Sequence, residues 1–262
     1  MRKKNVFYLV ITAVFMAVTL ILVLVPNVGF IQIPPVSITI VHIPILIGIV
    51  ILPIWHGAAL GLTFGLGSLF AAYTQASTPI DLAFQNPLVS VLPRIIFALV
   101  AFFIFHGIRL LVKHVKYGET ISFGLVSLLS LTVIVFGLEN FSDEYNWSSE
   151  LYLGLVILVS GIIITLYFLA NNKNNKTYSA VSSAFIISTI CHTLLVLGSL
   201  AVFKVDVFGN DSVKDLIMAV VMSNGMIEAF LAALIGTPVY LAISKRFPDL
   251  ANENLFLKNE RN

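Results

Sequence analysis

The sequence predicts an all-α integral membrane protein with about eight membrane helices, because several apolar runs approach the ~20 residues that a spanning helix needs. Of its 262 residues, 58% are hydrophobic and only 11% are charged, and the mean hydropathy is +0.99. A typical soluble domain carries about 25% charged residues. The single cysteine, Cys191, excludes a disulfide framework and a cysteine metal site.

The first apolar run covers residues 6–25 and follows the basic start Met1-Arg-Lys-Lys. It is long enough to span, and no small-residue cleavage site follows it, so we expect an uncleaved membrane helix with its N-terminus inside. Residues 26–37 contain prolines and a glycine, which exclude a regular helix and predict a folded loop on the outer side.

The next two predicted segments are residues 39–52, which are short for a span, and residues 57–73. Gly57, Gly61 and Gly65 recur at every fourth position of the second segment. Small residues at this spacing lie on one helix face and let a neighbouring helix approach closely. We therefore expect the glycine face to be a helix-packing surface.

The remaining spans follow at regular intervals along the chain. A polar loop at residues 74–85 leads into the run at 87–112. Two further runs are predicted to form a hairpin around an acidic loop, and two long runs and a polar tail complete the chain. These runs are residues 121–138, 151–169, 179–203 and 214–243.

The basic residues give the orientation. If the N-terminus is inside, twelve of the fifteen Lys and Arg residues fall at the inner ends of the spans, as the positive-inside rule requires. We therefore expect a multi-pass protein of a bacterial or archaeal cell membrane with both termini in the cytoplasm. The twelve are Arg2, Lys3, Lys4, Arg109, Lys113, Lys116, Lys173, Lys176, Lys245, Arg246, Lys258 and Arg261.

Two isolated charges, Arg94 and Glu228, interrupt the apolar runs. An arginine at the centre of a membrane costs ~2.5–3.5 kcal/mol or more, so such a charge usually faces a partner or a polar cavity. Asn86 and Ser90 precede Arg94 at intervals of four residues, and Asn224 precedes Glu228 by four, so each charge shares a helix face with polar groups.

These polar faces are predicted to form one substrate pocket that opens outward. Phe30 and Gln32 lie in the outer loop at a similar depth, and His192 lies in the run at 179–203. Other interpretations stay open. Arg94 and Glu228 could form only a structural ion pair, Asn86 could simply cap the helix that starts at Pro87, and His192 and His42 could be packing residues.

Motifs for catalysis or for ATP hydrolysis are missing from the sequence. It has no Walker A loop, no His-Glu-x-x-His, no Gly-x-Ser-x-Gly and no evident nucleophile beside a base. We therefore expect no catalytic residues, no cofactor and no metal, and a function other than that of an enzyme.

Four motifs give the chain a resemblance to a known family. They are Ala13-Val-Phe-Met-Ala17, Gly29-Phe-Ile-Gln-Ile-Pro-Pro-Val-Ser37, Asn86-Pro-Leu-Val-Ser-Val-Leu-Pro-Arg94 and Ser223-Asn-Gly-Met-Ile-Glu228. Together they resemble the substrate-binding S components of energy-coupling factor (ECF) transporters, which take up vitamins in bacteria and archaea.

The resemblance implies a single membrane domain, residues 1–262, built on a six-helix bundle. The bundle would comprise residues 5–118 and 178–245, with an inserted transmembrane hairpin at 119–176 and a polar tail at 246–262. It also implies that Ala13 and Ala17 form the small-residue face that docks on a T subunit.

The implied function is high-affinity substrate binding within an ABC-type transporter. The partners would be a transmembrane T subunit and two cytoplasmic ATPases, and the substrate a small water-soluble vitamin or precursor. Arg94 suits a carboxylate bound in a bidentate manner, and the loop motif most resembles members assigned to pantothenate. The alternatives are a self-sufficient carrier or channel for a small polar solute, an S component for another vitamin, and an intramembrane enzyme.

Overall fold

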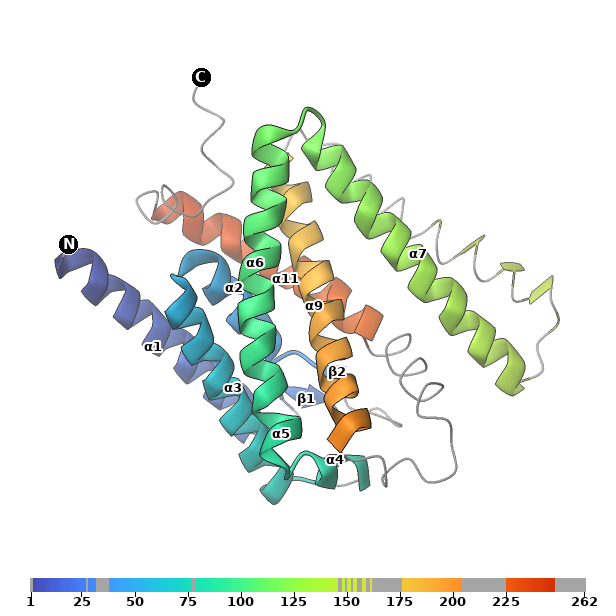
Figure 1. Ribbon diagram of the computed structural model, residues 1–262, viewed down its shortest axis with the longest axis horizontal. Helices are drawn as coiled ribbons and strands as arrows, with labels where there is room; N and C mark the ends of the chain where they lie inside the picture. The colour runs from blue at the N-terminus through green and yellow to red at the C-terminus, as the bar shows by residue number, and fades with distance from the viewer. Residues whose placement is uncertain are drawn as a thin grey trace.

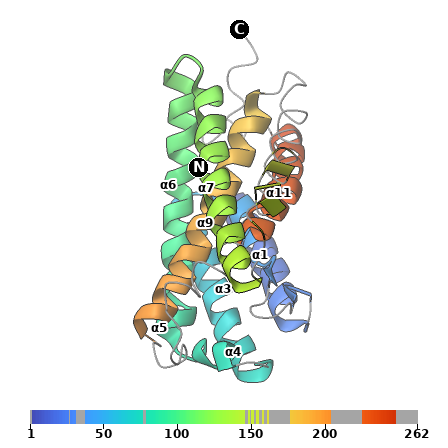
Figure 2. The same cartoon turned by 90° about the vertical axis from the view of Figure 1, so that its right-hand side faces the viewer.

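The computed structural model is a bundle of helices with one short strand pair (Figures 1 and 2). It describes residues 2–26, 28–31, 38–76, 79–145, 148, 150–151, 153–154, 157–158, 161, 176–203 and 225–247. The helices within these ranges are α1 (Arg2–Leu24), α2 (His42–Ile51), α3 (Ile54–Thr74), α4 (Pro79–Ala83), α5 (Pro87–Ser90), α6 (Leu92–His114), α7 (Gly118–Tyr145), α9 (Lys176–Phe203) and α11 (Met226–Arg246).

Five helical stretches in the described part of the chain are long and apolar enough to cross a membrane, so the protein is a multi-pass membrane protein. Four of the predicted spans are matched by α1, α3, the α5–α6 segment and α9, and α11 covers the described part of the last one. The stretches are Asn5–Leu24, Ile54–Thr74, Pro87–His114, Tyr178–Phe203 and Met226–Arg246.

The count of eight spans and the inserted hairpin stay predictions. Helix α7 covers the first arm of the hairpin and diverges from α6 and α9 along its length (Figure 1). Its apolar part, Gly118–Thr132, is shorter than a full span. Most of the second arm lies outside the described residues.

The short helix α2 lies in the middle of the bundle rather than spanning it. Its ten residues are about 15 Å long, half the ~30 Å hydrocarbon core. All ten are buried, and the helix packs against α1, α3, α6, α9 and α11. A helix that is apolar all round is expected in this position. Its first residue, His42, therefore begins inside the bundle.

A strand pair joins α1 to α2 on one side of the bundle. Strand β1 (Phe30–Ile31) runs antiparallel to β2 (Ile38–Thr39), with Phe30 opposite Thr39. The predicted loop therefore folds back on itself, and β2 leads directly into His42.

The predicted glycine face of α3 packs against α6. A Cβ atom on Gly61 would lie 2.7 Å from the carbonyl oxygen of Arg94 and from Cβ of Ala98, and one on Gly65 would lie 2.8 Å from Cα of Val91. Both distances are closer than real Cβ contacts allow, so glycine is needed for this approach. The packing prediction is confirmed, and it places α3 against the helical turn that carries Arg94.

We expect Gly61→Ala to lower the free energy of unfolding by ~1–3 kcal/mol, because the added methyl group collides with the backbone of α6. The matched control is Gly107→Ala on α6, where nothing lies within 4 Å of the added Cβ. The higher helix propensity of alanine should leave this control unchanged or up to ~1 kcal/mol more stable. Thermal unfolding in one detergent compares the variants, and equal melting shifts would contradict the packing argument.

Candidate functional site

Four ionisable side chains from four different helices meet inside the bundle. They are His42 of α2, Arg94 of α6, His192 of α9 and Glu228 of α11, and all four are buried. Arg94 is 4% exposed and Glu228 is 5% exposed. Because charges are almost never fully buried without partners, the contacts of each group indicate what the cluster does.

The Arg94 guanidinium is only partly satisfied by the described residues. Its Nη1 atom donates a hydrogen bond of 2.6 Å to the carbonyl oxygen of Val89. Its Cζ atom lies 5.0 Å from the ring centroid of Phe84 and 5.5 Å from that of Phe64, which are cation–π distances. Its Nε atom is buried and has no hydrogen-bond partner among these residues. The side chain therefore retains donors for a further acceptor.

Glu228, on α11, connects the strand pair with α9. Its Oε1 atom accepts a hydrogen bond of 2.5 Å from the backbone N–H of Thr39, and its Oε2 atom accepts one of 3.4 Å from the hydroxyl of Thr193. Glu228 and Arg94 interact electrostatically. The structure gives no direct ion pair between them in the described part of the chain, so this interaction acts at a longer range than a direct ion pair.

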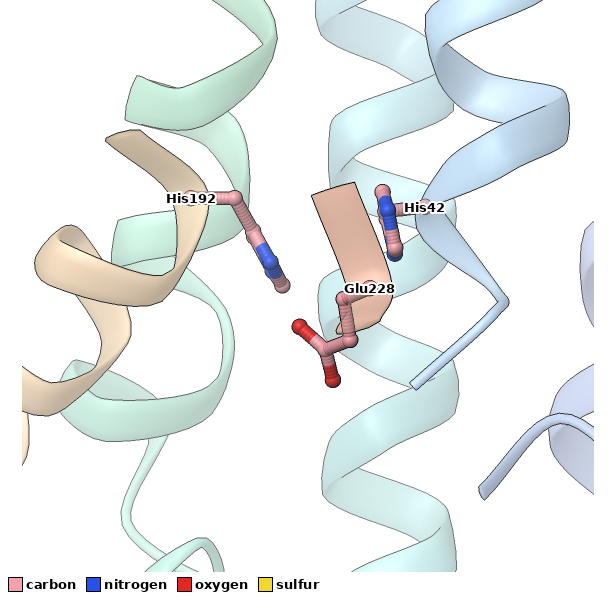
Figure 3. A group of neighbouring side chains, drawn as sticks. All are labelled: His42, His192 and Glu228. Atoms are coloured by element: carbon pink, nitrogen blue, oxygen red, sulfur yellow. The ribbon is translucent and has the colours of Figure 1, made fainter. Parts of the chain in front are cut away.

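The two histidines lie beside this carboxylate (Figure 3). Their ring centroids are 5.5 Å apart, with 17° between the ring planes. The His192 ring also packs on Phe97 at 4.6 Å and on Phe64 at 5.5 Å. Both ring nitrogens of His192 lack a hydrogen bond to any described residue, whereas the Thr39 backbone is a partner for the His42 ring at a geometry looser than a full hydrogen bond. Polar atoms of this kind point to a ligand, because buried polar groups are normally paired.

The side-chain oxygens of Asn86 and Ser90 form hydrogen bonds with backbone groups near Arg94. Asn86 caps α5, accepting a hydrogen bond of 3.0 Å from the backbone N–H of Leu88, and Pro87 occupies the first turn. Ser90 is buried, and its hydroxyl donates to the carbonyl oxygen of Phe84. The capping interpretation of Asn86 is confirmed, and direct ligand contact by either residue stays a prediction.

The other predicted site residues are divided between described and undescribed parts of the chain. Phe30 is half-buried in β1, opposite Thr39, whose N–H binds Glu228. Gln32 and Asn224 lie outside the described residues. The structure brings Arg94, His192 and Glu228 together, and their role in binding substrate stays a prediction.

The sequence favours a packing role for His42, and the structure places its ring in the cluster, 5.5 Å from the ring of His192. The available signal was its place at the start of an apolar helix, directly after the proline-containing loop.

Comparisons with known proteins agree with this architecture. The family model described as "ECF transporter, substrate-specific component" matches residues 7–147. A relative named "Pantothenate transporter PanT", from Leuconostoc mesenteroides subsp. mesenteroides, is 32% identical over 148 residues, which cover 52% of this chain and 72% of the relative. The chain therefore belongs to the family of substrate-specific components of ECF transporters, and it is a substrate-binding transport subunit of the membrane.

Proposed function

We propose that this chain is the subunit that binds pantothenate in an ECF-type transporter, with Arg94 holding the carboxylate of the vitamin. The observation that carries the proposal is a buried guanidinium with unused donors. An arginine offers five N–H groups in a planar fork that matches a carboxylate, and the described residues use one of them in a hydrogen bond. The name of the Leuconostoc relative supports this substrate.

Burial of the guanidinium supports an anionic ligand. A charge taken out of water is costly unless an opposite charge or several hydrogen bonds compensate for it. The nearest described carboxylate, that of Glu228, is committed to Thr39 and Thr193. A ligand carboxylate would supply the missing acceptors and a negative charge in direct contact with the guanidinium.

The partners are proposed from family membership and from the surface of α1. The sequence carries no Walker A loop, so energy must come from ATPases in other chains. Ala13 and Ala17 are exposed on α1, whereas Thr12 and Thr19 of the same helix face the bundle. A small-residue face of this kind allows close approach of another membrane helix, which supports docking on a T subunit.

The proposed transport cycle uses the Arg94 cluster to bind substrate and the small-residue face of α1 to dock on the T subunit. With both termini in the cytoplasm, the Arg94 cluster lies in the outer half of the membrane and takes substrate from outside. The loaded subunit then docks through α1, and ATP hydrolysis by the partner ATPases reorients it so that substrate leaves on the inner side.

Pantothenate should stabilise the purified protein by ~2.7 kcal/mol at 100 times its dissociation constant. Arg94→Gln should weaken binding roughly 10- to 150-fold, because it removes a charge-assisted contact of ~1.5–3 kcal/mol. The measurement is thermal unfolding in detergent with and without vitamin.

Arg109→Gln is the matched control, because Arg109 lies on the same helix far from the cluster, and it should bind like the wild type. Stabilisation of the Arg94→Gln variant equal to that of the wild type would exclude Arg94 as the anion site. Stabilisation by a different vitamin alone would exclude pantothenate as the substrate.

Replacing both Ala13 and Ala17 with phenylalanine should abolish uptake into cells and leave pantothenate binding to the purified protein unchanged. The bulky rings would separate α1 from the T subunit without touching the cluster. Leu128→Phe on α7 is a control that places the same ring at another exposed position, and it should transport normally. Normal uptake by the double variant would rule out docking through this face.

A further inference from the structure

We propose that His42, His192 and Glu228 bind the hydroxyl-bearing end of the ligand, opposite the carboxylate held by Arg94. This inference rests on the proposed function and extends it by assigning an orientation to the ligand and a role to His42. One nitrogen or oxygen atom from each of the three side chains lies within 4.8 Å of the others (Figure 3). Their chemistry selects among the groups that could bind there.

The hydrogen-bonding capacity of the three side chains fits hydroxyl groups. A neutral imidazole offers one N–H donor and one acceptor nitrogen, whereas a carboxylate only accepts. A hydroxyl group both donates and accepts a hydrogen bond. Two hydroxyls can therefore form hydrogen bonds with two imidazole rings and also donate to the same carboxylate. Both ring nitrogens of His192 are without a hydrogen bond to the described residues, and the His42 ring has only a loose contact with the Thr39 backbone, so each ring keeps at least one side for a hydroxyl.

A metal ion fits the same three side chains less well. It would take one nitrogen from each ring, and a metal-bound histidine almost always donates its other N–H to a carboxylate, a carbonyl or water. The described residues provide no such acceptor for His192, and only the Thr39 backbone is close to His42.

The surrounding charges fix the direction of the ligand. The Glu228 carboxylate repels a ligand carboxylate and accepts hydrogen bonds from hydroxyl groups. The Arg94 guanidinium attracts a ligand carboxylate. Phe64 and Phe97 flank His192 and offer apolar contact. Pantothenate matches this arrangement, since it carries a carboxylate at one end and, at the other, two hydroxyls on either side of a carbon with two methyl groups.

The test compares pantothenate with N-(3,3-dimethylbutanoyl)-β-alanine, which keeps the amide, the carboxylate and the methyl groups but lacks both hydroxyls. Calorimetry on the full-length wild-type protein in detergent should show a preference for pantothenate of roughly 100-fold or more, because a site built for hydroxyls leaves buried polar groups unpaired with the analogue. Equal affinities would overturn the inference without any variant.

His42→Phe and His192→Phe should then each weaken pantothenate binding roughly 10- to 100-fold while the analogue binds within about threefold of wild type, so the preference collapses. Without ligand these variants should melt no lower than wild type, because they remove unpaired buried polar atoms. His106→Phe, at an exposed position of α6, is the matched control and should keep the preference.

The outcomes separate the two proposals. If the histidine variants bind pantothenate and the analogue with equally reduced affinity, the hydroxyl assignment is overturned and the proposed function stands. Failure of the wild type to bind pantothenate would overturn both. Stabilisation of the wild type by Zn²⁺ that disappears in both histidine variants would replace the hydroxyl site with a metal site.

Discussion

The structure depends on one constraint, which is that a guanidinium lies inside an apolar bundle where hydrocarbon offers it no hydrogen bonds. The protein meets part of this need with local geometry. The break between α5 and α6 leaves the carbonyl of Val89 available to Arg94, and two phenyl rings cover the cation. Close packing of α3 at Gly61 and Gly65 holds this turn in place. The remaining donors are those that we propose bind the carboxylate of the substrate.

The opposite side of the cluster is organised by Glu228. This single carboxylate connects β2 through Thr39 and α9 through Thr193 to its own helix, α11. Strand β2 leads directly into α2 and His42, so the same contact that anchors the strand pair also brings His42 close to His192. The Glu228 carboxylate therefore connects the strand pair to the cluster of buried ionisable side chains.

The sequence alone identified the residues whose chemistry conflicts with their surroundings. Arg94, His192 and Glu228 are visible as polar groups within apolar runs, and the glycine spacing of α3 is a purely local pattern. His42 was underestimated because its role depends on where the short helix α2 lies, and hydropathy cannot distinguish a central half-length helix from a membrane span. Asn86 and Ser90 share a face with Arg94 by spacing, yet the break at Val91 turns their oxygens toward backbone groups.

The central claim is that Arg94 binds the carboxylate of a pantothenate-like ligand. The most direct test is to titrate the protein with pantothenate and with pantothenol, in which an alcohol replaces the carboxylate. The account predicts that wild-type protein binds pantothenate roughly 10- to 150-fold more tightly, the value of a charge-assisted contact, and that Arg94→Gln loses this difference. Equal affinity of the wild type for the two compounds would contradict it.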